Sequence, residues 1–262
     1  MTSPIAMTSS LTSAPLRHIV LDIEGTTTPI AFVHETLFSY ARSQVRNYLA
    51  VHFDSDETRA DLAQLREEHD ADMKLNRQPP PLINAPRDAE IDSLVAYINW
   101  LIDQDRKSTG LKSLQGKIWM QGYHDGTLKA QLFPDVAPAL EAWHHAGLKI
   151  SIFSSGSSLA QKLLFGHTEA GDLSEFIDSY FDTTTGSKTA IDSYRCIASA
   201  LRAPAREILF ISDVVAELDA ASAAGMQTLL CVRPGNPQQF PGKHQIIHTF
   251  DEISDIMPQH DT

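Results

Sequence analysis

Residues 19–27, IVLDIEGTT, decide the fold of this chain. Three strand-forming apolar residues run directly into two carboxylates, Asp22 and Glu24, which are one residue apart. Gly25 follows at once, and glycine adopts the backbone angles that let a chain leave a strand sharply. In an open α/β sheet, ligands bind at the carboxyl ends of the strands. The stretch therefore predicts a strand that ends in a chemically active loop, although an Asp there also suits an ordinary turn.

Three later apolar runs also end on polar residues, and helical patterns separate them. The runs span 148–153, 208–211 and 228–232. Apolar residues recur at helical spacing in four further segments, 134–146, 159–164, 197–201 and 215–224. Strands that alternate with helices of this length are typical of a parallel sheet with right-handed crossovers. We therefore predict an α/β core of three layers around a mainly parallel sheet.

A long interval separates the first strand from the second. Helical patterns fill most of it, at 35–52, 57–75, 89–106 and 111–121. The interval is too long for a crossover and too apolar for a linker. We predict that it is a helical cap domain, and that its acidic run from Asp54 to Asp72 is a solvated helix face. The predicted division is a flexible tail at 1–17, a core at 18–32 and 131–254, the cap at 33–130 and a tail at 255–262.

Composition and charge exclude some classes of binding partner. The formal charge of -12 and the pI of about 5.3 argue against a nucleic-acid binder, which needs a basic face. No apolar run reaches the length of a membrane span, so we expect no membrane partner. Cys196 and Cys231 lack zinc-ligand spacing, and we expect both to pack in the core. Such cysteines suit a reducing cytoplasm, where we expect a monomer.

The predicted strand ends bring chemically useful side chains to one edge of the sheet. Lys188 lies in a loop that opens a helix. Carboxylates supply the oxygen ligands that Mg²⁺ takes, while serine and lysine hold phosphate oxygens. An Asp that attacks phosphorus forms an aspartyl phosphate. Each residue alone also suits a turn, a helix cap or a solvated position, so it is the set that indicates phosphate chemistry. Its members are Asp22, Glu24, Ser154, Ser155, Lys188 and Asp213.

In this order, the motifs resemble those of the haloacid dehalogenase superfamily of phosphatases. The matching parts are the Asp-x-Asp/Glu-Gly-Thr loop at 22–26, the strand-ending Ser154, Lys188, and the acidic loop at Ser212 and Asp213 with Glu217 following. The resemblance implies a HAD-like Rossmannoid core with an inserted helical cap. Most members carry a second Asp where this chain has Glu24, and that departure points to a narrower family.

The narrower resemblance is to the enolase-phosphatase E1 family of methionine salvage. It covers nearly everything from Arg17 to about Phe250 and is carried by residues 21–27, 114–119, 122–123, 154–157, 160–167 and 232–236. It implies an enzyme that enolises 2,3-diketo-5-methylthiopentyl 1-phosphate and then removes the phosphate. The implied product is the acireductone 1,2-dihydroxy-3-keto-5-methylthiopentene, and the implied cofactor is one Mg²⁺ per chain.

The motif match also implies roles for the residues. Asp22 is the nucleophile, Asp22, Glu24 and Asp213 hold the metal, and Ser154, Ser155 and Lys188 bind the substrate. Glu24 is a candidate proton shuttle, but direct coordination through its side chain competes with that role, whereas coordination through its backbone carbonyl does not. The base for enolisation is either Glu24 or a cap residue.

Two other functions remain open from the sequence. A HAD-type phosphatase for another small phosphate ester has the same core motifs, because these motifs read phosphate rather than the leaving group. A non-catalytic module that kept the fold is disfavoured, because Asp22, Lys188 and Asp213 are all present.

Overall fold

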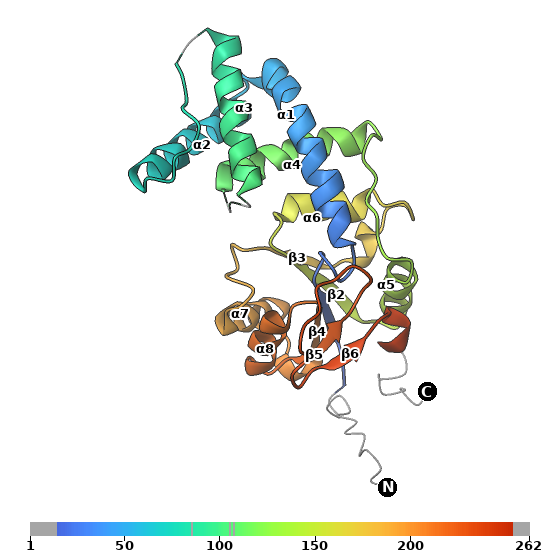
Figure 1. The fold of residues 1–262 in the computed structure, drawn as a ribbon. Helices are drawn as coiled ribbons and strands as arrows, with labels where there is room; N and C mark the ends of the chain where they lie inside the picture. The colour runs from blue at the N-terminus through green and yellow to red at the C-terminus, as the bar shows by residue number, and fades with distance from the viewer. Residues whose placement is uncertain (1–14, 85, 105, 107, 254–262) are drawn as a thin grey trace. The chain divides into compact units, whose positions relative to one another are not determined.

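The computed structural model describes residues 15–84, 86–104, 106 and 108–253. The chain divides into two compact units, one formed by residues up to 30 together with those from 130 onward, and the other by residues 31–129 (Figure 1). Of the predicted tails, 255–262 and residues 1–14 of the first lie outside the described residues. Residues 15–17 lead directly into the first strand, and Leu16 among them is buried.

The first unit is built on a parallel sheet. Across the described residues the strand order is β3-β2-β1-β4-β5-β6, and every neighbouring pair is parallel. This sheet, with its helices, confirms the predicted α/β class. Because β1 lies in the middle with β2 on one side and β4 on the other, the chain reverses direction across the sheet between β1 and β4. The strands are β1 His18–Leu21, β2 Lys149–Phe153, β3 Ser179–Phe181, β4 Ile208–Ser212, β5 Gln227–Cys231 and β6 Gln245–Ile247.

Helices cover both faces of this sheet (Figure 1). The α-helices are α5 Val136–His145, α6 Ser158–Gly166, α7 Ile191–Leu201 and α8 Val215–Ala223, and the short 3₁₀ turns are η2 Ser174–Phe176, η3 Ala205–Glu207 and η4 Phe250–Ile253. α7 and α8 lie together on one side, and α5 lies on the other. β3 and β6 were not among the predicted strands, because each has only three residues and lies at an edge where little of it is buried.

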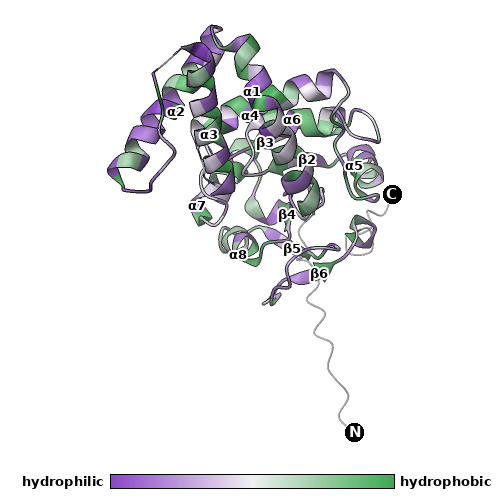
Figure 2. Ribbon diagram, turned by 45° about the horizontal axis from the view of Figure 1, so that its top comes forward, coloured by the Kyte–Doolittle hydropathy of each residue, from purple (hydrophilic) through white to green (hydrophobic). Residues whose placement is uncertain are grey.

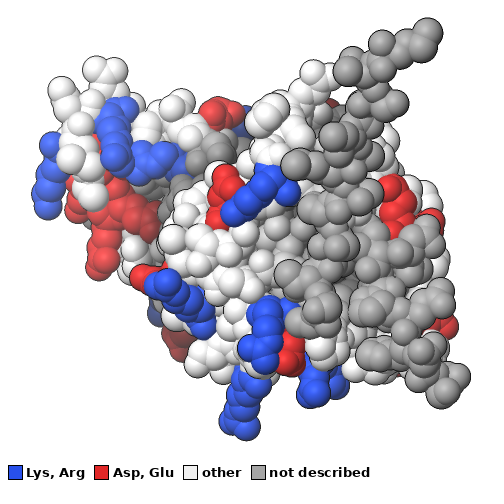
Figure 3. Space-filling model, turned by 90° about the horizontal axis from the view of Figure 1, so that it is seen from below, with Lys and Arg blue, Asp and Glu red and all other residues white. Residues whose placement is uncertain are grey.

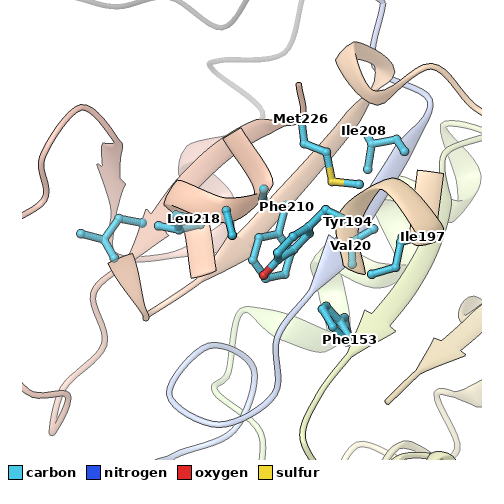
Figure 4. Close-up of a cluster of buried hydrophobic side chains, with 11 residues drawn as sticks. Val20, Phe153, Tyr194, Ile197, Ile208, Phe210, Leu218 and Met226 are labelled. Atoms are coloured by element: carbon cyan, nitrogen blue, oxygen red, sulfur yellow. The ribbon is translucent and has the colours of Figure 1, made fainter. Parts of the chain in front are cut away.

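One apolar cluster joins the sheet to α7 and α8 (Figure 4). Tyr194 of α7 lies with its ring centroid 5.1 Å from that of Phe210 and 5.6 Å from that of Phe153. All three side chains are fully buried. Aromatic side chains contribute large buried areas, so this cluster fixes α7, and the loop before it, against the sheet.

One of the two cysteines differs from the prediction. Cys231 is buried at the end of β5, but Cys196 lies exposed on α7. The prediction for Cys196 was wrong because α7 is amphipathic: its buried face carries Tyr194 and Ile197, and Cys196 lies between them in sequence on the other side.

The second unit is built of helices. A π-helix, η1 Phe32–Phe38, continues into α1 Ser39–His52, followed by α2 Asp56–Lys74, α3 Arg87–Asp103 and α4 Thr109–His124. Ser55 and Ser108 cap α2 and α4 through their side-chain oxygens. Both α2 and α3 carry polar and apolar residues, and most of their buried residues recur at intervals of three or four, as in amphipathic helices (Figure 2).

The acidic run on α2 is not wholly solvated, so that prediction was wrong in part. Asp72 is only 1% exposed and accepts hydrogen bonds from Arg77 at 2.9 Å, Arg106 at 2.8 Å and the Tyr97 hydroxyl at 3.0 Å. Asp61 is buried and pairs with Lys117 at 2.6 Å. Burial of these carboxylates is tolerated because cationic side chains pair with them.

Two surface properties bear on partners. On the face drawn in Figure 3, the described Lys and Arg side chains stand among acidic and uncharged ones. Within the described residues, the helices are all too short or too polar to cross a membrane.

Candidate active site

The two aspartates meet because their strands are neighbours. Asp22 follows β1 and Asp213 follows β4, and these strands pair in parallel at the centre of the sheet. The Asp22 amide extends that ladder by donating to the Ile211 carbonyl at 3.0 Å. The site therefore lies at the carboxyl ends of β1 and β4, where the strand order reverses and where open α/β sheets bind ligands.

Gly25 permits the close approach of these two loops. Its φ is +76°, in the left-handed region that favours glycine. A Cβ added there would lie 2.3 Å from Asp213 Oδ2, so the Asp213 carboxylate would have to move away. The turn itself is held by the Ile23 carbonyl, which accepts from the amides of Thr27 and Thr28, each at 2.9 Å. The glycine predicted to turn the chain therefore also makes room for the Asp213 carboxylate.

Lys188 links the β1 loop to α8. Its ammonium group donates to Asp22 Oδ1 and lies 2.7 Å from Glu217 Oε2. The lysine side chain is only 10% exposed. Burial opposes its charged form, yet the carboxylates of Asp22 and Glu217 outweigh burial and hold the pKa of Lys188 above its ordinary value. The Tyr194 hydroxyl donates to the Lys188 carbonyl at 2.6 Å, so the aromatic cluster also fixes the lysine backbone.

Glu217 is the site residue to which sequence reasoning gave no role. It lies in the first turn of α8, is buried, and accepts from Ser212 Oγ at 2.9 Å in addition to its pairing with Lys188. Burial and then the Asp22 charge raise its pKa. The available signal was its position one helical turn after Asp213, which returns its side chain to the strand end.

Asp213 has an unusual environment for a carboxylate. It is 7% exposed, and among the described residues its Oδ1 has no hydrogen-bond partner. Burial, followed by the negative charges of Asp22 and Glu217, raises its pKa to about 7. A buried oxygen without a partner is costly, so this carboxylate is suited to receive a cation.

The loop after β2 lies at the same edge of the sheet. Ser154 is buried and its amide donates to the Phe181 carbonyl of β3 at 3.1 Å, while its hydroxyl accepts from the Gly156 amide at 3.2 Å. Gln161 of α6 donates to the carbonyls of Gly156 and Phe181, at 2.9 and 2.8 Å. Ser155 is half-buried beside them. Two serines therefore stand on a braced loop suited to phosphate oxygens.

The structure places the predicted residues in two sets. Lys188 contacts Asp22 directly, and Asp213 reaches the Asp22 loop at Gly25. Ser154, Ser155 and Glu24 lie on loops at the same edge of the sheet. Glu24 is half-buried, and its backbone forms a bridge with Thr28.

The acidic residues suit a divalent ion whose coordination is completed by other oxygens. Within the described residues, no three His, Cys, Asp or Glu side chains are grouped closely enough to hold a metal on their own. However, the buried carboxylates of Asp22 and Glu217 contact the ammonium of Lys188, and the buried Asp213 lies close enough to interact with the charges of all three. Mg²⁺ is bound by one or two carboxylates together with waters and substrate phosphate, so this donor set fits it.

Comparison with known proteins places the chain among hydrolases. The model of the haloacid dehalogenase-like hydrolase family matches residues 16–225. Enolase-phosphatase E1 of Synechococcus elongatus is 52% identical over 237 residues, which cover 90% of this chain and 96% of that protein. An Arabidopsis thaliana protein whose name joins methylthioribulose-1-phosphate dehydratase to enolase-phosphatase E1 is 46% identical over 91% of this chain and 48% of that protein. Among solved structures, the UTR4 protein of Saccharomyces cerevisiae matches with a TM-score of 0.71 and 36% identity, covering 90% of this chain and 99% of that one.

The buried pairing of Lys188 predicts a large loss of stability when it is removed. Lys188→Met leaves two buried carboxylates without their cation, and we expect unfolding in urea to become easier by about 3 kcal/mol. Adding Glu217→Gln removes one of those charges and should restore part of the loss. Lys149→Met is the control, because Lys149 makes an ion pair of 2.8 Å with Asp178 but is 57% exposed, so its loss should stay below about 1 kcal/mol. Equal losses for the two lysines would contradict the prediction.

The raised pKa of Asp213 predicts the pH dependence of the metal-free protein. Between pH of about 4, where an unfolded Asp titrates, and about 7, the folded protein holds a proton that the unfolded chain has lost. Stability in a chelator should therefore fall as pH rises from 5.5 to 7.5. Asp213→Asn should flatten this slope, measured as the free energy of unfolding at both pH values. Asp192→Asn, at an exposed carboxylate, should not, and an unchanged slope in Asp213→Asn would disprove the assignment.

Proposed function

The chain belongs to the haloacid dehalogenase-like hydrolases, in the enolase-phosphatase E1 family, and we propose that its site performs the chemistry of that family on one substrate. It is a phosphatase. The proposed substrate is 2,3-diketo-5-methylthiopentyl 1-phosphate, and the products are phosphate and the acireductone 1,2-dihydroxy-3-keto-5-methylthiopentene. The observation that carries this proposal is the buried contact of Lys188 with Asp22, beside Asp213, in a chain that is 52% identical to a named relative over 237 residues.

Asp22 is the proposed nucleophile. One of its carboxylate oxygens attacks phosphorus, and the bond from phosphorus to the substrate oxygen breaks, leaving an aspartyl phosphate and an enolate. Lys188 supports this step because its ammonium group, fixed by Glu217, lies against Asp22 and places positive charge where a dianionic phosphate approaches. Ser154, Ser155 and Lys188 hold the phosphate oxygens.

Glu24 is the proposed proton shuttle. Its carboxyl group gives a proton to the leaving enolate oxygen, and then takes a proton from the water that attacks the aspartyl phosphate. That second attack breaks the bond between phosphorus and Asp22 and returns the carboxylate to its starting state. The backbone bridge between Glu24 and Thr28 fixes where this side chain begins.

One Mg²⁺ per chain is the proposed cofactor. Asp22, Asp213 and either the backbone carbonyl or the carboxylate of Glu24 would hold it, and when bound it neutralises charge on the phosphate oxygens. The partnerless Oδ1 of Asp213 supports this assignment.

Several finer proposals rest on the sequence. Residues 33–130 are proposed to be the cap domain of the enzyme, and the base for enolisation is either Glu24 or a residue of that domain. We propose a monomeric, cytoplasmic enzyme without nucleic-acid or membrane partners. The core residues are expected to recognise the phosphate group rather than the rest of the substrate. Measuring activity on other small phosphate esters therefore distinguishes the proposed enzyme from a HAD-type phosphatase that acts on another ester.

Asp22→Asn should abolish phosphate release without unfolding the protein. An amide does not attack phosphorus, so we expect a loss of at least about 10³-fold in kcat. The fold should persist because Lys188 stays paired with Glu217. Phosphate release and the circular dichroism spectrum measure the two effects, with Asp192→Asn as the control for an exposed carboxylate. Normal turnover by Asp22→Asn would disprove the nucleophile.

Glu24→Gln separates the two half-reactions. The variant keeps the backbone carbonyl of residue 24, but its side-chain amide transfers no proton. Phosphate release should therefore fall by about 10²- to 10⁴-fold. Enolisation is followed separately, by deuterium exchange from solvent into the substrate in nuclear magnetic resonance spectra. If exchange persists, the base lies elsewhere, and if exchange is also lost, Glu24 is the base. A normal rate for both steps would remove Glu24 from proton transfer.

A further inference from the structure

A single loop after β5 grips both acidic loops of the site. It spans residues 233–239, RPGNPQQ, and three of its side chains bond to backbone atoms of the loops that carry Asp22 and Asp213. We propose that Arg233, Asn236 and Gln239 form a clamp that sets the spacing between the two aspartates and so prepares the site for a divalent cation. This inference rests on the proposed function, because it assigns the two aspartates to one metal.

One end of the clamp holds the β1 loop. Arg233 Nε donates to the Thr26 carbonyl at 3.1 Å, and Asn236 Nδ2 donates to the Gly25 carbonyl at 2.8 Å. Two successive carbonyls immediately after Glu24 are therefore fixed by side chains from another strand's loop. Because Gly25 lies against the Asp213 carboxylate, these bonds act where the two loops approach each other.

Arg233 is itself immobilised, which makes this end rigid. Its guanidinium forms a forked pair with Asp135 at 2.9 and 2.8 Å and donates to the His248 carbonyl at 2.8 Å. The rings of Phe133 and Phe250 lie 4.6 and 4.7 Å from it. A buried arginine held by a forked pair and stacked between two rings loses little freedom when it donates a further bond.

The other end holds the β4 loop through one amide group. Gln239 Nε2 donates to the Asp213 carbonyl at 2.7 Å, and its Oε1 accepts from the Val215 amide at 3.1 Å. The residue that precedes α8, Val214, provides no side-chain cap, so Gln239 supplies an acceptor that the helix start lacks. The backbone of Asp213 is thereby held from the same loop that holds Gly25.

A clamp is useful because a divalent cation needs its carboxylate ligands at a set spacing. The two loops already approach closely, since a single added carbon at Gly25 would collide with the Asp213 carboxylate. Without bracing, the loops would be free to separate and would have to be brought together again on binding. Bonds that hold the spacing in advance lower that cost, as supporting residues do in other metal sites.

The rival explanation is that these residues only stabilise their own loops. Gln239 would then be a helix cap and Asn236 a loop brace, with separate effects on melting temperature and none on cation binding. The two explanations differ in whether the ends of the clamp are coupled. If spacing is the function, releasing either end relaxes it, and releasing the second end adds little.

The test is a double-mutant cycle with Mg²⁺ alone as the probe. Wild type, Asn236→Ala, Gln239→Ala and the double variant are titrated with Mg²⁺ by calorimetry, and their melting temperatures are recorded without metal. We expect each single variant to bind Mg²⁺ about 10-fold more weakly than wild type. The double variant should be no more than about twofold weaker than the weaker single variant, because coupled sites are not additive.

Gln238→Ala is the matched control, since it removes the same amide from an exposed neighbouring residue and should leave Mg²⁺ binding within about twofold of wild type. The inference is overturned if Gln239→Ala and Gln238→Ala bind alike, if the single effects multiply in the double variant, or if only melting temperatures change. Calorimetry needs no substrate. Wild type that binds Mg²⁺ but does not turn over the diketo phosphate therefore refutes the proposed substrate, and leaves the clamp to be judged by the cycle.

Discussion

The contact of the Lys188 ammonium with Asp22 and Glu217 is the interaction on which the site depends. It joins three segments that are far apart in sequence: the loop after β1, the loop before α7 and the first turn of α8. A buried ion pair is weak evidence for stability, because desolvation offsets much of the attraction. Its value here is positional, since it holds the Asp22 carboxylate at the end of β1 against a buried cation.

The apolar packing beneath the site serves the same end. Tyr194 packs between Phe153 and Phe210 and donates its hydroxyl to the Lys188 carbonyl, so one residue connects the core to the lysine loop. Ser212, at the end of β4, likewise donates to Glu217. The hydrogen bonds of Tyr194 and Ser212 thus connect the side chains of the site to elements that the apolar core holds in place. That is how a rigid scaffold keeps a charged cluster in place.

The sequence predicted the parts of this structure that local pattern determines. Strongly apolar runs ending on polar residues revealed β1, β2, β4 and β5, and the same runs placed Asp22 and Asp213 at one edge. The sequence did not predict the contacts that form only when distant segments come together in the fold. Glu217 meets its cationic partner only because the fold brings Lys188 to α8, and the buried Asp72 is neutralised in part by Arg106, which lies 34 residues away in sequence. The edge strands β3 and β6 have only three residues each, too few to show a recognisable apolar pattern.

Glu24 is the residue for which we propose two competing tasks, metal coordination and proton transfer. Its backbone is fixed by the bridge to Thr28 and by the Gly25 amide, which donates to the Thr28 carbonyl at 2.8 Å. The position of its carbonyl oxygen is therefore independent of its side chain. A glutamate also places its carboxyl group one methylene further from the backbone than an aspartate does. A fixed carbonyl near the metal ligands and a longer, half-buried carboxyl group can divide coordination and proton transfer between them. On this reasoning, shortening the side chain would disturb proton transfer before it disturbed the metal.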